Sequence, residues 1–196
     1  MMGKTHLAVG MAVGAALAAP DPAGCAAALA AGAFGGVLAD ADALRNDKNH
    51  DALTAEGLAF GVVLAAIAAA YLFGWGLQEY VSANAFSVGA GIAGVSLMWL
   101  FGIFQNHRGC MHSLIALLLF SVCMTLISPA VGLAGMAGYA SHLALDLTNR
   151  RGLCLLWPMR RRFCLRLFYA DKKANAACMW LGLAAAAAIT FAKCAG

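Results

Sequence analysis

Long apolar runs are the feature that most limits what this chain can fold into. Residues 57–75, 86–105 and 112–147 contain almost no charged side chain, and a helix needs about 20 apolar residues to cross a bilayer. The chain as a whole is 63% hydrophobic and 11% charged, whereas a soluble domain carries about 25% charged residues. The sequence therefore predicts an all-α polytopic membrane bundle, with residues 1–196 forming a single integral membrane domain.

Helix-breaking residues divide the chain into about seven helical segments. Pro20-Asp21-Pro22 separates the first two, with Asp21 suited to an N-cap and Pro22 to a first helical turn. Both are short, so this pair either crosses the membrane fully or forms a re-entrant hairpin. As one helix, the run 112–147 would be ~54 Å long, so we expect a break at Ser128-Pro129. The predicted helices are His6–Ala19, Pro22–Leu38, Gly57–Trp75, Phe86–Gln105, His112–Ser128, Pro129–Leu147 and Asn175–Lys193. The predicted loops are polar (Asp40–Glu56), short (Gly76–Ala85) and basic (Thr148–Lys173).

Basic residues collect on one side of this predicted zigzag. Only Lys193 falls on the other side, and the positive-inside rule makes the crowded side cytoplasmic in a bacterial inner membrane. The crowded side receives Lys4, Arg45, Lys48, Arg108, Arg150, Arg151, Arg160, Arg161, Arg162, Arg166, Lys172 and Lys173. The basic loop either only sets the topology or also attracts anionic lipids. Membrane lipids are the expected partners and nucleic acid is not; the sequence leaves the oligomeric state open.

Cysteine and glycine patterns indicate packing rather than chemistry. The seven cysteines show no CxxC spacing, so we interpret them as small hydrophobic residues without a disulfide framework. Gly89-x-Gly91-x-x-Gly94 lies inside an apolar segment and lacks the βαβ context of a dinucleotide site. Close helix packing explains it better, as it does the Gly132, Gly135 and Gly138 series. No organic cofactor is predicted.

Histidine and aspartate gather at helix ends on the predicted cytoplasmic side. His142 and Asp146 are four residues apart and share a helix face. Asp40 and Asp42 end a predicted helix, where acidic groups are unfavourable unless a cation is present. Ionisable residues at membrane depth are usually functional. The candidate ligands, from four regions of the chain, are His6, Asp40, Asp42, His107, His112, His142 and Asp146.

These side chains predict a divalent metal site. Imidazole together with carboxylate suits zinc, manganese or iron, and mixed sites also take magnesium. One zinc ion uses three or four protein ligands, so the larger set predicts one ion or two, with zinc as the first expectation.

Several segments carry a family resemblance, in order along the chain: His6, Leu38-Ala39-Asp40-Ala41-Asp42, His107–Leu114 (HRGCMHSL), Gly138–Thr148 (GYASHLALDLT) and Leu155-Leu156-Trp157-Pro158. They resemble the YdjM-like inner-membrane metal-dependent hydrolases, a bacterial family that includes LexA-regulated members. The family usually has proline at the position of Ala39 and threonine at that of Met111. It often has histidine at the position of Ala43. His50 is a distant candidate to replace the ligand lost after Asp42. The resemblance implies hydrolysis but no particular substrate.

The leading hypothesis is a membrane-embedded hydrolase that cleaves a phosphoester of a lipid at the cytoplasmic face. The metal lowers the pKa of bound water, Asp42 serves as the base and Arg108 stabilises developing negative charge. Ser113 and Thr148 orient the ligands from a second layer. The alternative is a divalent-metal transporter or channel that uses the same cluster. Transport sites lie near the membrane midplane, and a cation pathway has no evident use for Arg108.

Overall fold

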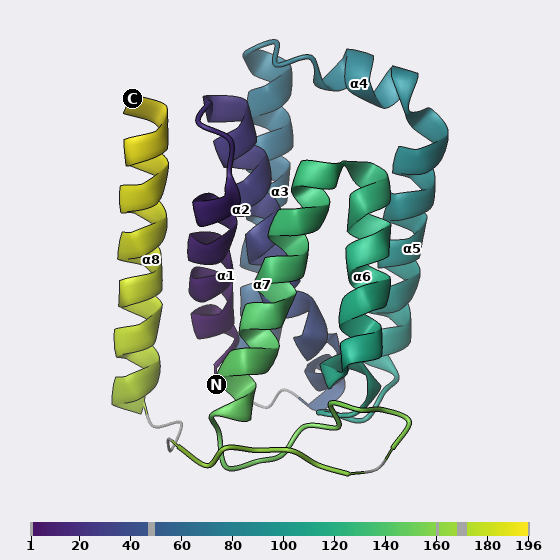
Figure 1. The fold of residues 1–196 in the computed structure, drawn as a ribbon, viewed down its shortest axis with the longest axis vertical. Helices are drawn as coiled ribbons and strands as arrows, with labels where there is room; N and C mark the ends of the chain where they lie inside the picture. The colour runs from purple at the N-terminus through teal and green to yellow at the C-terminus, as the bar shows by residue number, and fades with distance from the viewer. Residues whose placement is uncertain (1, 47–49, 160, 168–171, 196) are drawn as a thin grey trace.

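The computed structural model describes residues 2–46, 50–159, 161–167 and 172–195, and it is an all-α bundle (Figure 1). Lys48 and Arg160, two residues assigned to the basic side, lie outside the described residues. There are two 3₁₀ helices in the described residues: η1 (Ala39–Asn46) directly follows α2, and η2 (Cys110–His112) precedes α6. The α-helices of the described residues are α1 (Gly3–Leu17), α2 (Pro22–Leu38), α3 (Asp51–Leu72), α4 (Leu77–Ala83), α5 (Ala85–Ile103), α6 (Leu114–Ile127), α7 (Pro129–Leu147) and α8 (Lys172–Ala195).

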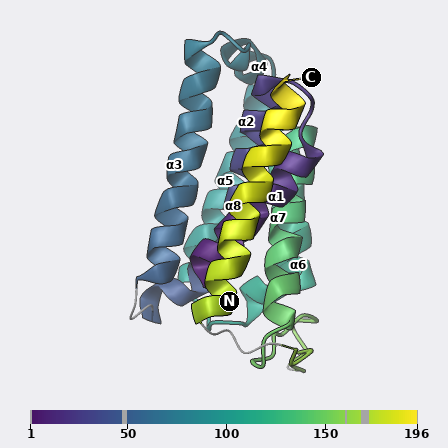
Figure 2. The same ribbon diagram turned by 90° about the vertical axis from the view of Figure 1, so that its left-hand side faces the viewer.

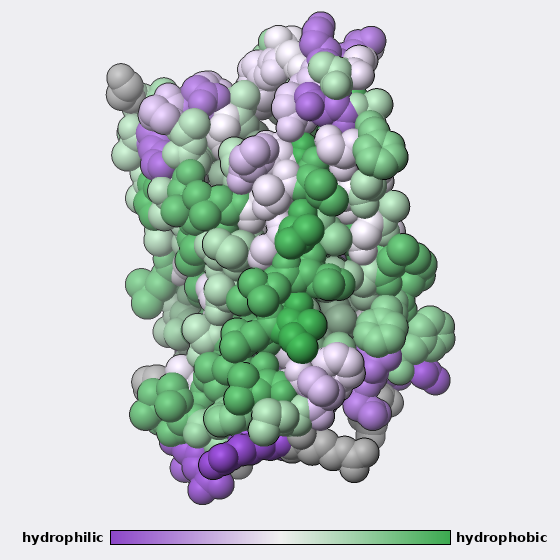
Figure 3. All heavy atoms as spheres, turned by 45° about the vertical axis from the view of Figure 1, so that its right-hand side comes forward, coloured by the Kyte–Doolittle hydropathy of each residue, from purple (hydrophilic) through white to green (hydrophobic). Residues whose placement is uncertain are grey.

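The long helices run side by side between two ends of the molecule. The chain starts at one end and finishes at the other (Figure 1), and apolar side chains form a band between more polar ends (Figure 3). Among the described residues, four segments are long and apolar enough to cross a membrane: Pro22–Arg45, Asp51–Leu72, Ala85–Ile103 and Lys173–Ala195. α1 has 15 residues, about 22 Å of helix against a hydrocarbon core of ~30 Å. The fold is that of a membrane-embedded helical bundle in contact with lipids.

The structure has both helix breaks that the sequence predicts. Asp21 caps α2 by accepting a hydrogen bond from the Gly24 backbone N–H at 2.8 Å, and Pro22 is the first helical residue. α6 ends at Ile127 and α7 begins at Pro129, which confirms the break at Ser128-Pro129.

Three helices, α1, α2 and α7, form the centre and pack backbone against backbone. A Cβ atom added to Gly32 of α2 would lie 2.3 Å from the carbonyl oxygen of Gly10 in α1. A Cβ atom at Gly138 of α7 would lie equally close, 2.3 Å, to the carbonyl oxygen of Gly32. Helices in lipid associate through such small-residue contacts because hydrophobic driving force between them is weak. α8 lies along the outer side of α1 (Figure 2).

Two predicted loops contain helix instead. The predicted loop Gly76–Ala85 forms the short helix α4, whose Tyr80 hydroxyl donates to the Ile127 carbonyl at 2.9 Å. The predicted polar loop Asp40–Glu56 holds η1 and the first turns of α3, which begins at Asp51 rather than Gly57. A carboxylate in the first turn favours a helix, and Asp51 also accepts from the Gly3 backbone N–H at 2.6 Å. This long-range contact is absent from any local sequence pattern.

The segment after α7 folds back under one end of the bundle. Leu153 and Phe163 form an antiparallel bridge, and the backbone N–H groups of Leu165 and Leu167 donate to the carbonyls of Leu147 and Thr148. η1, η2 and the first turn of α1 lie at this same end (Figure 1). The described basic residues, apart from Lys193 near the end of α8, belong to these segments, to the turn before η2 and to the start of α8.

Candidate metal centre

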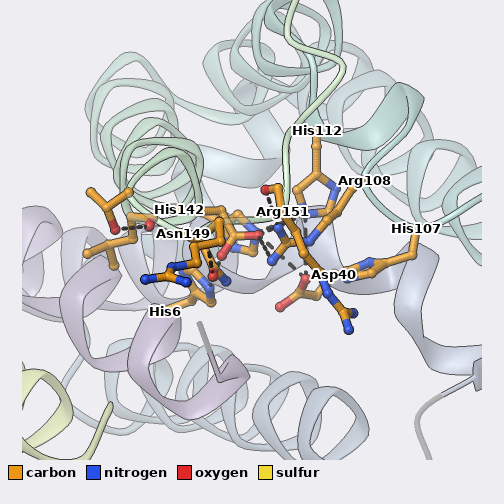
Figure 4. Close-up of polar contacts among 12 residues, drawn as sticks. His6, Asp40, His107, Arg108, His112, His142, Asn149 and Arg151 are labelled. Atoms are coloured by element: carbon orange, nitrogen blue, oxygen red, sulfur yellow. Dashed lines mark hydrogen bonds and ion pairs between the residues drawn. The ribbon is translucent and has the colours of Figure 1, made fainter. Parts of the chain in front are cut away.

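The histidines and aspartates predicted as ligands come together at this end of the bundle (Figure 4). α1 supplies His6 in its first turns, η1 supplies Asp40 and Asp42, and α7 supplies His142 and Asp146 near its end. His107 lies in the turn after α5, and His112 ends η2. His107 is the most accessible of them, with 38% of its side chain exposed, whereas the other six are buried.

His112 and His142 face each other through one nitrogen each. Nδ1 of His142 donates to the Gly36 carbonyl oxygen at 2.7 Å, and Nδ1 of His112 lies 3.0 Å from Oδ2 of Asp42. With a proton on Nδ1 of each ring, the Nε2 atoms are the ones available to an ion. The two Nε2 atoms are 3.2 Å apart. Two nitrogens bound at ~2.0–2.1 Å to one tetrahedral ion would be separated by about 3.3 Å, so the spacing of this pair could hold one ion.

Asp40, Asp146 and His6 surround that pair. Oδ1 of Asp40 lies 3.6 Å from Nε2 of His112 and 3.7 Å from Nε2 of His142. Oδ2 of Asp146 lies 3.9 Å from Nε2 of His112, and its Oδ1 lies 3.3 Å from Nε2 of His6. The His6 ring stacks on His142 with centroids 3.8 Å apart.

Asp42 contacts two of the candidate ligand histidines through their Nδ1 atoms. Its Oδ1 lies 2.7 Å from Nδ1 of His107, and its Oδ2 lies 3.0 Å from Nδ1 of His112. The backbone N–H of Arg108 also donates to Oδ2, at 3.0 Å. Carboxylates that accept from the far nitrogen of a ligand histidine fix its tautomer and orientation.

Arg108 joins this cluster to the segment after α7. Its Nη2 lies 2.8 Å from Oδ2 of Asp146, and its Nη1 donates to the Arg151 carbonyl at 2.6 Å. Its backbone has φ 64°, a left-handed conformation that is uncommon outside glycine and is often found at functional sites. The guanidinium is therefore held in place from two sides.

The donor set fits a divalent cation. Every candidate ligand belongs to at least one of three groups whose ligand atoms lie within 4.8 Å of one another. Nδ1 of His6 is buried without a hydrogen-bond partner, although such groups are normally satisfied, and its Nε2 has the 3.3 Å contact with Asp146. Burial lowers the pKa of His112, but Asp42 and Asp40 outweigh it and raise that pKa to about 10. A metal ion at His112 therefore replaces a proton, as metal binding at histidine generally does.

Three residues proposed to support or replace ligands do not contact the cluster in the bonds described. Ser113 and Thr148 contact local backbone, and His50 lies elsewhere. Ser113 caps α6, since its Oγ accepts from the Ala116 N–H at 3.2 Å. Thr148 donates to the Leu145 carbonyl at 2.6 Å. His50 is exposed at the start of α3 and belongs to none of the three ligand groups formed by the described residues.

Sequence analysis missed two buried side chains near the site. The Tyr139 hydroxyl donates to the carbonyl of Met111, directly before His112. Its spacing of three residues from His142 on the same helix face was an available signal. Glu56, assigned to a polar loop, is 4% exposed in α3, where its Oε2 accepts from Nε1 of Trp99 at 2.8 Å. No local pattern links residues so far apart.

Comparison with known proteins agrees with the sequence resemblance. A family model described as YdjM inner membrane protein matches residues 1–195. Proteins named inner membrane protein YdjM from Escherichia coli strain K12 and Shigella flexneri are each 38% identical over 74 residues. The match covers 34% of this chain and 38% of each relative, so it spans well under half of either relative. No solved structure matches the chain. Because the family model covers nearly the whole chain, this protein belongs to the YdjM family of inner membrane proteins.

Proposed function

We propose that this protein is a metal-dependent hydrolase that cleaves a phosphoester of a membrane lipid at the cytoplasmic face. The observation that carries the proposal is a buried cluster of histidines and aspartates with a fixed arginine, at the end of the bundle where basic residues gather. Buried ionisable groups are costly to maintain in a membrane protein and are usually functional.

Five of the seven candidate ligands would bind metal directly, and Asp42 and His107 would lie outside them. Nε2 of His112 and His142, with the carboxylates of Asp40 and Asp146 and the imidazole of His6, would hold one or two divalent ions, with zinc as the first expectation. A bound ion would supply Lewis acidity and lower the pKa of a coordinated water. The surrounding chain excludes bulk water, since these five residues are at most 7% exposed.

We propose that Asp42 handles the proton through His107. The 2.7 Å contact with Asp42 favours a proton on Nδ1 of His107 and a free lone pair on Nε2. His107 is also the member of the cluster most accessible to an incoming molecule. A carboxylate that orients an imidazole in this way is a common arrangement for general acid–base catalysis.

Arg108 is proposed to stabilise negative charge on the phosphoryl oxygens. Its Nη1 and Nη2 groups hold a carbonyl and a carboxylate, while its buried Nε has no hydrogen-bond partner. Pre-positioned donors of this kind lower the barrier because they need little reorganisation as charge develops.

A lipid substrate is supported by what surrounds the cluster. Arg150, Arg151, Arg161, Arg162 and Arg166 are exposed on the segment after α7. Basic residues beside an apolar surface attract anionic headgroups, and the same residues favour a cytoplasmic position for this end. Position also supports hydrolysis over transport, because the cluster lies at the helix ends, whereas transport sites lie near the midplane.

The experiment is a metal analysis of the purified protein together with an assay on vesicles and micelles of phospholipids with different headgroups. We expect bound divalent metal, release of a phosphorylated or dephosphorylated headgroup product, loss of turnover on chelation, and recovery when metal is returned. Metal flux into indicator-loaded vesicles without any hydrolysis would replace the proposal with transport.

A further inference from the structure

Two cysteines lie together at the end of the bundle opposite the metal centre. Cys25 is in the first turn of α2 and is 2% exposed, and Cys194 is exposed near the end of α8. We infer that these two residues form a disulfide bond that ties α8 to the hairpin of α1 and α2. The long sequence separation explains why cysteine spacing did not predict this pair.

Contacts made by Cys25 and by the residue before Cys194 bring the two cysteines to the same turn. Lys193, directly before Cys194, donates through Nζ to the carbonyls of Ala16, at 2.9 Å, and Ala18. On the other side, the Cys25 thiol donates to the Ala19 carbonyl at 3.5 Å. Both cysteines are thus held at the turn between α1 and α2, beside which α8 ends (Figure 1). Both thiols are free, and Cys194 is among the neighbours that act on the Cys25 thiol.

The surroundings of this end favour oxidation. Lys193 is the one basic residue of this end among those described, so the positive-inside rule places this end in the periplasm. Disulfides form and persist there, whereas thiols on the cytoplasmic side stay reduced. The inference rests on the orientation given in the proposed function and is independent of whether the metal centre hydrolyses a lipid.

Bond formation requires an external oxidant, which we take to be a periplasmic protein disulfide. The thiolate of exposed Cys194 attacks one sulfur of that disulfide, and one oxidant thiolate leaves. The thiolate of Cys25 then attacks Sγ of Cys194 in the mixed disulfide and releases the second oxidant thiolate. The two cysteines lose two protons and two electrons in total, and the oxidant gains both electrons as two thiols.

The bond would act on the least buried of the four candidate spans. The apolar window of Lys173–Ala195 is 11% buried, compared with 61% for that of Pro22–Arg45. Its contact with α1 is close at Gly182, where an added Cβ would lie 2.9 Å from the Ala8 backbone. A covalent link at the end of α8 fixes the part of the helix that lies beyond this contact.

The test counts reactive thiols in the full-length protein expressed in its membrane. Cells are quenched in acid, and the protein is denatured and labelled with a maleimide that adds mass, with or without prior reduction. Of seven cysteines, five (seven minus the bonded pair) should react before reduction and seven after it. Cys194→Ser, at an exposed position, should give six in both conditions, and Cys25→Ser should do the same. The control Cys164→Ser, at the basic end, should give four and then six.

Two outcomes overturn the inference, and a reporter fused after Gly196 distinguishes them. Seven reactive thiols before reduction, with the reporter in the periplasm, would refute the disulfide and leave the orientation intact. A reporter in the cytoplasm would refute the orientation, and the disulfide with it. A dimer on a non-reducing gel that disappears in Cys194→Ser, with Cys25 still reactive in the wild type, would also refute the intramolecular bond.

Discussion

The inner helices α1, α2 and α7 and the outer helices α3, α5 and α8 have similar composition but different surroundings. The spans that contain α2 and α3 are both strongly apolar, yet 61% of the apolar window of the first and 22% of that of the second is buried. Leu64 and Leu72 of α3 and Leu181 of α8 are 65%, 78% and 70% exposed. Hydropathy therefore marks which helices enter the membrane but does not identify the helices that form the centre of the bundle.

Most of the closest glycine contacts and the helical candidate metal ligands belong to the inner group. A Cβ atom at Gly32 of α2 would clash with backbone, whereas one at Gly61 of α3 would meet nothing within 4 Å. The inner helices also carry His6, His142 and Asp146, and α2 leads directly into Asp40 and Asp42. Close backbone packing brings these side chains within reach of one another, so packing and the metal centre depend on the same three helices.

The largest difference between the groups is expected from replacing one histidine in each. His142→Ala removes a nitrogen that faces His112 at 3.2 Å and should abolish both metal binding and turnover. His50→Ala, at the exposed start of α3, should leave both unchanged. Metal analysis of the two purified variants, after confirming membrane insertion, makes the comparison. Full metal content in His142→Ala would show that the ligand assignment is wrong.

Arginine gives the next contrast, between a fixed and an exposed side chain. Arg108→Lys keeps the charge but loses the fork that holds Asp146 and the Arg151 carbonyl. We expect turnover to fall by ~10²–10³ while metal content is retained. Arg162→Lys, on the exposed loop, should have little effect on either. Unchanged turnover in Arg108→Lys would reduce this residue to a topology signal, and faster metal flux would favour transport.

Stability should separate two glycine substitutions. Gly32→Ala forces a methyl group to within 2.3 Å of the Gly10 carbonyl oxygen, and overpacking of this kind costs about 3 kcal/mol. Gly61→Ala has open space around it and should be neutral or slightly stabilising, because alanine favours helix. Thermal unfolding in detergent measures both. Equal transition temperatures would mean that α1 and α2 do not pack as closely as the structure places them.

Much of the fold follows from local sequence, and the exceptions have a common cause. Apolar runs, Asp21-Pro22 and Ser128-Pro129 predict most of the helices because helix length and breaking are local properties. α4 was missed because it has only seven residues, and the early start of α3 involves a contact between Asp51 and Gly3. Contacts between distant residues are not visible in a local pattern.

The candidate site shows the same division. A zigzag of helices was enough to predict that His6, Asp40 and His142 would share one end of the bundle. It could not predict that Asp42 contacts two histidines through their Nδ1 atoms, because side-chain orientation depends on tertiary packing. Nor could it predict that Glu56 pairs with Trp99.

The smallest contrast compares two tyrosines that both donate to a backbone carbonyl. Tyr139 on α7 is fully buried and holds Met111, next to His112, whereas Tyr80 on α4 is 40% exposed and holds Ile127. Tyr139→Phe leaves a buried carbonyl without its donor and should cost about 1–2 kcal/mol. Tyr80→Phe should cost at most about 0.5 kcal/mol, because water can replace the lost hydroxyl.

A second measurement separates a purely structural role from one at the metal centre. If Tyr139 fixes η2, its loss also lets His112 move, and metal affinity should weaken by about tenfold, the low end of the loss seen for groups that support a ligand. Tyr80→Phe should leave the affinity unchanged. Metal titration of the two variants below their unfolding temperatures tests this. If Tyr139→Phe lowers the transition temperature but leaves the affinity unchanged, η2 is held by its other contacts, and the close coupling of packing and metal binding does not extend from α7 to His112.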